Sequence, residues 1–140
     1  MCGICGFTGE VIDRNETIHK MTEVITHRGP DSDGFFLDDR ISMGFRRLSI
    51  IDLEAGSQPI YNEDKSLVLT FNGEIYNYRD LRKELIEAGH KFYTETDSET
   101  LIHGFEEWGT DLLNSLGVCS VSLFTIKRTE VCLLQGTSSE

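Results

Sequence analysis

Cys2 is the residue of this chain best suited to covalent chemistry. It follows the initiator methionine, and because its side chain is small, we expect Met1 to be removed and Cys2 to become the new N-terminus. A thiol and an α-amine would then belong to one residue, and an α-amine is a base that works near neutral pH. Cys2 would therefore carry both a nucleophile and its general base, and it would need no histidine partner.

Other functions of the cysteines stay open at this point. Cys2 and Cys5 fit the C-x-x-C pattern, but a thioredoxin-type dithiol follows a strand and opens a helix, whereas this pair lies at the start of the chain. Zinc would need a second ligand pair, and Cys119 and Cys132 are far apart in the sequence. The four histidines show no ligand spacing either: His19, His27, His90 and His103. We expect no metal site, and a structural Cys2 is as compatible with the spacing as a catalytic one.

Asn72, Gly73 and Glu74 follow a predicted strand over residues 67–71. Asn-Gly is typical of a type I′ hairpin turn, which is the simpler interpretation. The functional interpretation is an oxyanion hole, in which the Asn amide and the unhindered backbone N–H of Gly converge on one developing negative charge.

Charged residues elsewhere are suited to anchoring a substrate. Arg46 and Arg47 lie beside an apolar stretch, and a single fixed arginine is what bidentate recognition of a carboxylate requires. Asp97 stands at a predicted helix start, where it is commonly a cap but could also pair with a substrate ammonium.

The elements that would position these residues are short strands grouped between helices. Apolar runs predict strands over 4–8, 35–38, 41–45 and 67–71, and a closing hairpin over 118–126 and 130–134. Capping residues and apolar periodicity predict helices that begin after Asp13, Asn77 and Thr96, and Gly89 should end the second. Because the strands occur in clusters, we expect antiparallel sheets covered by helices.

The acidic composition argues against two classes of binding partner, nucleic acids and membranes. The 140 residues carry 13 Lys and Arg against 24 Asp and Glu, a net charge of −11, so we expect one acidic domain with no nucleic-acid or membrane partner. No apolar run approaches the ~18 residues of a membrane helix, and charged residues interrupt any secretory signal. We therefore expect a cytoplasmic protein whose cysteines are thiols.

Six motifs occur in a fixed order: Met-Cys-Gly-Ile-Cys-Gly at 1–6, His27 to Asp31, Arg-Leu-Ser-Ile at 47–50, Gln58-Pro59, Asn-Gly-Glu-Ile-Tyr-Asn at 72–77 and Thr96 to Glu99. Together they resemble the class II glutamine amidotransferase domain of glutamine-dependent asparagine synthetases. The resemblance covers residues 2–116. It implies an α+β fold, the N-terminal-nucleophile hydrolase αββα sandwich of two antiparallel sheets, which we expect to be incomplete at the C-terminus.

The resemblance also implies a reaction. Cys2 would attack the side-chain amide of L-glutamine, ammonia would leave, and water would release glutamate from the thioester. Asn72 and Gly73 match the oxyanion donors. No cofactor is implied for this step.

Five positions match the substrate-binding residues of the family. Arg47 matches the residue that holds the α-carboxylate of glutamine, and Leu48 and Ile50 belong to the same motif. Glu74 and Asp97 match the acidic positions around the α-ammonium. A zwitterionic substrate needs one cationic and one anionic anchor, so these assignments agree with charge.

The chain departs from the family in two respects. It has no match to the synthetase domain, to which the ATP and Mg of the full-length family belong, so the partner would be a separate synthetase subunit or a second copy in a homodimer. Residues 117–140 also diverge abruptly, and we interpret them as a tail from an altered reading frame or an erroneous gene end. The alternative function is a non-catalytic fragment that acts at most as an interaction module.

Overall fold

Two antiparallel sheets, each covered by helix on one face, make up the fold. The computed structural model describes residues 2–48, 57–127 and 130–136. The chain divides into two compact units, an N-terminal half (Met1–Pro59) and a C-terminal half (Ile60–Glu140). The predicted class, α+β with antiparallel sheets, is confirmed.

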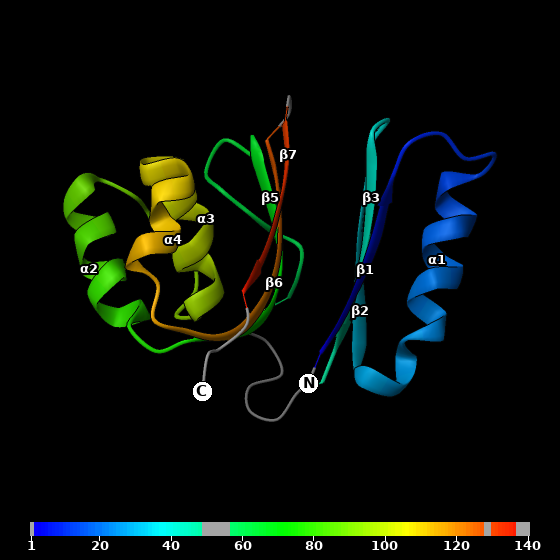
Figure 1. Cartoon of the computed structure of the whole chain (residues 1–140), viewed down its shortest axis with the longest axis horizontal. Coiled ribbons are helices and arrows are strands. Elements are labelled where there is room, and N and C mark those ends of the chain that lie inside the picture. Colours follow the sequence, from blue (N-terminus) through cyan, green and yellow to red (C-terminus); the bar gives the residue numbers. More distant parts are fainter. Residues whose placement is uncertain (1, 49–56, 128–129, 137–140) are drawn as a thin grey trace. The chain divides into compact units, whose positions relative to one another are not determined.

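The N-terminal half is a three-stranded sheet with one helix. Its strands are β1 (Gly3–Thr8), β2 (Ser32–Leu37) and β3 (Ile41–Arg47), in the order β1-β3-β2. Helix α1 (Arg14–Val24) runs along one face of this sheet and is followed by the 3₁₀ turn η1 (Thr26–Arg28), as Figure 1 shows. Gly3 pairs with Arg46, so the start of β1 lies beside the end of β3.

Helix α1 begins directly after Asp13, as the sequence predicts. The Asp13 carboxylate accepts a hydrogen bond from the backbone N–H of Glu16 at 2.8 Å, which confirms the cap. The inner face of α1 is formed by the buried Ile18 and Thr22, whereas the apolar Val24 is 75% exposed. Thr22 is tolerated there because its hydroxyl donates to the Ile18 carbonyl oxygen at 2.8 Å.

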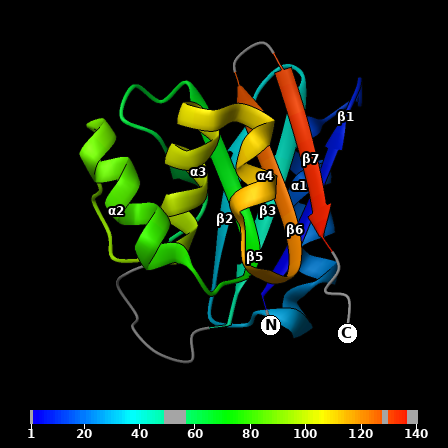
Figure 2. The same cartoon turned by 60° about the vertical axis from the view of Figure 1, so that its left-hand side comes forward.

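The C-terminal half is a four-stranded sheet with helices on one face. Its strands are β4 (Ile60–Tyr61), β5 (Leu67–Ile75), β6 (Val118–Lys127) and β7 (Glu130–Gly136), in chain order across the sheet. Its helices are α2 (Tyr78–Ala88), α3 (Asp97–Trp108), the 3₁₀ turn η2 (Gly109–Asp111) and the short α4 (Leu112–Ser115). Figure 2 shows α2 and α3 on the same side of β5. The apolar core joins β5 to α2, α3 and α4: Leu67, Leu69, Phe71, Ile75, Leu81, Leu101, Ile102 and Leu112.

The predicted closing hairpin and the predicted end of the second helix are confirmed, but the predicted Asn77 cap is wrong. The closing hairpin is present as β6 and β7, and Gly89 ends α2 in the left-handed region at φ 108°. The Asn77 side chain does not cap α2. It instead donates to the Ser115 carbonyl oxygen at 2.7 Å and accepts from the Gly117 N–H at 2.8 Å, and so ties the start of α2 to the approach to β6. Within the described residues, no helix combines the length and apolar character needed to span a membrane.

Candidate functional site

The thiol of Cys2 lies beside the end of β3. The backbone N–H of Leu48 donates to Cys2 Sγ at 3.4 Å, and the Leu48 carbonyl oxygen is 4.0 Å from the same sulfur. Because Gly3 pairs with Arg46, antiparallel register brings the residue before Gly3 next to the residues after Arg46. Arg28 Nε also donates to the Cys2 carbonyl oxygen at 3.4 Å, so the chain start is held from two sides.

Cys5 has a different environment. Its sulfur lies 3.3 Å from Thr22 Oγ1 on α1 and 3.8 Å from the Gly44 carbonyl oxygen. Burial raises the pKa of the Cys5 thiol, against the weaker opposing effect of these two hydrogen bonds. Both cysteines are free thiols, and their sulfurs contact different elements. These contacts favour a structural role for Cys5 and disfavour a C-x-x-C redox pair.

The two arginines at the end of β3 are distinguished by their surroundings. Arg46 forms an ion pair with Asp33 on β2 at 3.3 Å, and its Nε donates to the Thr22 carbonyl oxygen at 3.2 Å. Arg46 is thus held by the sheet and helix of its own half. Arg47 is half-buried and directly precedes Leu48, whose backbone contacts the Cys2 thiol, and the Arg47 carbonyl oxygen accepts from the Asp31 N–H at 3.1 Å. Ile50, the remaining predicted residue of this motif, lies outside the described residues.

Asn72 and Gly73 lie inside β5, which corrects the sequence prediction. The strand was expected to end at Phe71 in a hairpin turn, but it continues to Ile75. The pairing with β6 shifts register between Asn72 and Glu74, so Gly73 lies at an irregularity of the ladder. Such bulges re-aim side chains and are frequent beside active sites. The simple turn interpretation is therefore wrong.

Asp97 joins this segment at the start of α3. Its Oδ2 accepts from the backbone N–H of Ile75 at 3.1 Å, which fixes the helix start to the end of β5. Burial raises the pKa of Asp97, and the negative charge of Glu74 raises it further, while hydrogen bonds from Ile75 and Ser98 oppose the shift. The two carboxylates thus repel each other, and a cation placed near both would relieve that repulsion.

The predicted site residues form two groups, each assembled within its own half. The N-terminal half brings Cys2, Arg47 and Leu48 together at the start of β1 and the end of β3. The C-terminal half brings Glu74 near Asp97, and Asn72 and Gly73 precede Glu74 on the same strand. Each group joins residues that are more than twenty positions apart in the chain.

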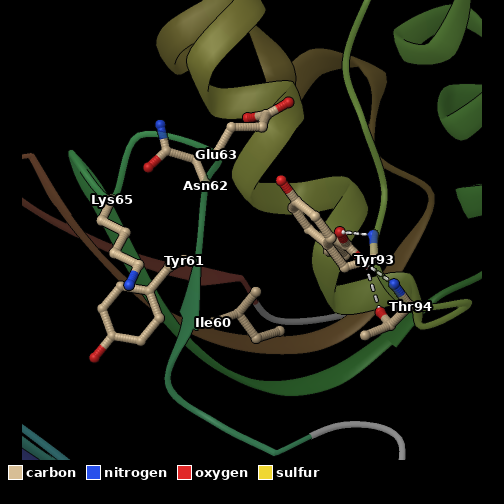
Figure 3. Close-up of a pocket in the computed structure, with 8 residues that line it drawn as sticks. Ile60, Tyr61, Asn62, Glu63, Lys65, Tyr93 and Thr94 are labelled. Carbon is tan, nitrogen blue, oxygen red and sulfur yellow. Dashed lines mark hydrogen bonds between the residues drawn. The ribbon is translucent and has the colours of Figure 1, made fainter.

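A cavity of about 300 Å³ lies elsewhere in the C-terminal half (Figure 3). None of its lining residues is a predicted site residue, and its polar lining includes Glu63, Thr94 and Glu99. Near it is a group that sequence reasoning missed, in which donor atoms of Glu63, His90, His103 and Glu106 all lie within 4.8 Å of one another. No short-range spacing indicates this group, because its residues come from three separate segments.

Comparison with known proteins decides the family. The sequence model of the family described as "Glutamine amidotransferase domain" matches residues 1–135. The chain belongs to this family. The family match extends beyond residue 116, at which we predicted the domain to end. The origin of residues 117–140 stays a prediction.

The relatives of this amidotransferase domain are glutamine-hydrolysing asparagine synthetases. The chain is 44% identical over 121 residues to asparagine synthetase 1 of Bacillus subtilis, covering 81% of this chain and 19% of that protein. It is 37% identical to asparagine synthetase 2 of the same organism, covering 96% and 19%, and 40% identical to asparagine synthetase 1 of Arabidopsis thaliana, covering 83% and 20%. The chain thus spans about a fifth of the length of these relatives.

Solved structures support the same fold. Glutamine phosphoribosylpyrophosphate amidotransferase from Bacillus subtilis matches with a TM-score of 0.57 at 20% identity, over 71% of this chain and 24% of that one. A structure described as the allosteric regulatory enzyme of purine biosynthesis matches with a TM-score of 0.54 at 21% identity, over the same shares. At this level of identity the likeness concerns the fold.

Proposed function

We propose that this amidotransferase domain hydrolyses the side-chain amide of L-glutamine to glutamate and ammonia, with Cys2 as the nucleophile. The observation that carries the proposal is the hydrogen bond from the Leu48 N–H to Cys2 Sγ at 3.4 Å. A backbone donor aimed at sulfur stabilises negative charge that develops there as the thiol gives up its proton.

The bond-making and proton-transfer steps use groups on Cys2 and water. The α-amine accepts the thiol proton, and Sγ attacks the amide carbon of glutamine to form a tetrahedral intermediate. The α-ammonium of Cys2 then returns its proton to the leaving nitrogen, and the carbon–nitrogen bond breaks. Ammonia departs, and a thioester between Cys2 and the glutamyl group remains. Water attacks that thioester, the carbon–sulfur bond breaks, and glutamate and the free thiol result. We propose that no cofactor takes part in this step.

The oxyanion of each tetrahedral intermediate needs donors, and we assign these to Asn72 and Gly73. The register shift at Gly73 supports this assignment. Where the pairing of two strands is irregular, a backbone N–H or a side-chain amide can point away from the neighbouring strand and donate to a ligand. A donor of this kind lowers the activation barrier by about 3 kcal/mol.

The substrate anchors follow the charges of glutamine. Arg47 binds the α-carboxylate, with Leu48 and Ile50 beside it in the same motif, and Glu74 and Asp97 bind the α-ammonium. The raised pKa of Asp97 supports the last assignment, because it reflects a buried carboxylate beside a second negative charge.

The ammonia would serve a synthetase reaction. The relatives are named asparagine synthetases, and this chain spans about a fifth of their length. We propose that the acceptor reaction, with its ATP and Mg, takes place in a synthetase domain of the same protein or in a separate subunit. We place both reactions in the cytoplasm, and the assembly that we propose besides a separate subunit is a homodimer.

The test is glutamate release from glutamine by the purified chain, with intact mass spectrometry to show that Met1 has been removed. The proposal predicts activity in the processed wild type, none in Cys2→Ala and retention in Cys5→Ser. Activity in Cys2→Ala would refute the nucleophile. A folded, processed chain without activity would leave the non-catalytic interaction module as the function.

A further inference from the structure

Two imidazoles and two carboxylates converge in the C-terminal half, away from the residues assigned to glutamine. His90 Nδ1 lies 3.8 Å from Glu63 Oε1 and 3.7 Å from Glu106 Oε2. His103 Nδ1 lies 3.4 Å from Glu63 Oε2 and 3.8 Å from Glu106 Oε2. The same nitrogen of each imidazole therefore faces the same two carboxylates, as ligands face a shared centre.

His103 is buried among carboxylates that stand 3.4–3.8 Å from its ring nitrogens, without forming a hydrogen bond of good geometry with any of them. Its side chain is fully buried, and neither ring nitrogen has a hydrogen-bond partner among the described residues. An imidazole always carries polar nitrogens, and leaving them without hydrogen bonds in a protein interior is unfavourable. The cluster is therefore more than a group of surface acids, since its buried member directs a nitrogen without a hydrogen bond toward the two carboxylates.

Each histidine also has a carboxylate behind it. His90 Nε2 lies 3.1 Å from Glu107 Oε2, and His103 Nε2 lies 3.5 Å from Glu99 Oε1. A carboxylate at Nε2 favours the tautomer with its proton on that nitrogen, which leaves the Nδ1 lone pair directed into the cluster. Metal-binding histidines show this arrangement, in which the outer carboxylate fixes the ring and the inner nitrogen binds the ion.

The carboxylates are held in place as well. Lys91 N–H donates to Glu63 Oε1 at 3.0 Å, and Asn62 Nδ2 donates to Glu106 Oε1 at 3.1 Å. Glu99 accepts backbone hydrogen bonds from Tyr93 at 2.6 Å and Thr94 at 2.7 Å. These two bonds fix the orientation of the carboxylate that stands behind His103.

We propose that Glu63, His90, His103 and Glu106 bind one zinc ion that fastens the β4–β5 turn and the α2–α3 connection to α3. Zn–N and Zn–O bonds of 2.0–2.2 Å in a tetrahedron place ligand atoms roughly 3.3–3.6 Å apart. The four histidine–carboxylate distances are 3.4–3.8 Å and all four ligand atoms lie within 4.8 Å of one another, so the side chains would move together by up to roughly 1 Å on binding the ion. Two carboxylates balance the charge of the ion. Imidazole donors favour zinc over magnesium or calcium, which prefer oxygen alone.

The site is reachable from solvent. Glu63 and Glu99 line the cavity of about 300 Å³ shown in Figure 3, where the labelled Glu63 stands beside Asn62. A hydrated ion can enter along this side and exchange its waters for the four ligands. The ion is structural in this proposal, because all four ligands are protein atoms and none is a residue assigned to glutamine.

Zinc titration of the full chain, stripped with a chelator and followed by calorimetry, tests the proposal. We expect one zinc ion per chain, a higher Tm with zinc than without it, and no comparable effect of magnesium. Cobalt in place of zinc should give the visible absorption of a tetrahedral site without a thiolate charge-transfer band. Failure to bind zinc, or binding through thiolate, would overturn the proposal.

Matched variants locate the ion. Glu106→Gln and His90→Asn change partly exposed ligands, so the chain should still fold by circular dichroism, and each should weaken zinc binding about tenfold or more. Glu84→Gln on the exposed face of α2 and His27→Asn in the N-terminal half are the controls, and both should bind as the wild type does. Cys2→Ala should also retain full binding. Equal affinity in ligand and control variants, or loss in Cys2→Ala, would contradict the assignment.

Discussion

The backbone N–H of Leu48 donates a hydrogen bond to the sulfur of Cys2 across 3.4 Å. The two residues are 46 positions apart, and the antiparallel pairing of β1 with β3 brings them together. The contact depends on the backbone of residue 48 and not on its side chain. It couples the position of the proposed nucleophile to the end of the strand that carries Arg47.

Replacing Leu48 by proline removes this donor, because proline has no backbone N–H. A hydrogen bond to a charged acceptor contributes about 1.5–3 kcal/mol, so the rate of Cys2 alkylation by iodoacetamide at neutral pH should fall roughly tenfold or more in Leu48→Pro. Leu48→Ala keeps the N–H and is the matched control. Equal rates in the two variants would show that the hydrogen bond does not activate the thiol.

Arg47→Lys should raise the KM for glutamine about tenfold while changing kcat less, since a point charge replaces a planar fork that can bind a carboxylate bidentately. Steady-state kinetics measure this. Arg46→Lys is the comparison, because Arg46 pairs with Asp33 and Thr22 within the fold, and this change should lower Tm slightly with KM unaltered. A KM shift in Arg46→Lys alone would exchange the roles of the two arginines.

Asp97 should make glutamine binding depend on pH. Burial and Glu74 raise the pKa of Asp97, so the carboxylate that binds the α-ammonium is lost at a higher pH than for an ordinary aspartate. The Kd for glutamine, measured by calorimetry in the Cys2→Ala background, should increase as pH falls through this raised pKa. In Cys2→Ala with Asp97→Asn, the Kd should be higher and nearly independent of pH over that range.

The raised pKa of Asp97 also predicts how the Asp97→Asn substitution changes the stability of the fold. A carboxyl whose pKa is raised on folding stabilises the fold below its unfolded pKa and loses that contribution as pH rises through the folded value. Asp97→Asn keeps an acceptor for the Ile75 N–H, so its Tm at neutral pH should be at least that of the wild type, in contrast to its loss of binding. Asp80→Asn, on the exposed first turn of α2, is the control. A marked fall in Tm for Asp97→Asn would indicate a structural role instead.

Local chemistry explains which elements the sequence predicts correctly. Asp13 caps α1, and Gly89 ends α2 in a left-handed conformation, because each acts within one turn of its own helix. Asn77 was predicted from the same kind of rule but bonds to Ser115 and Gly117, almost forty residues away. A rule based on neighbouring residues fails where the side chain bonds to residues that are distant in the sequence.

The candidate site shows the same division. Cys2 is recognisable from its position in the chain and Arg47 from its motif, whereas the register that brings Leu48 to the thiol is a property of the sheet. Asn72-Gly73 looks like a turn because that dipeptide usually forms one, and only the pairing of β5 with β6 extends the strand through it. The Glu63, His90, His103 and Glu106 cluster has no sequence signature, because a turn, a connection and a helix each supply part of it.

Labelling with an alkylating glutamine analogue, followed by peptide mass mapping, tests the central claim most directly. The account predicts one label per chain, on the thiol of Cys2 in an N-terminal peptide that has lost Met1, with protection by excess glutamine and none of the label in Cys2→Ala. A label on Cys5 or another residue, or equal labelling of Cys2 in chains that retain Met1, would contradict it.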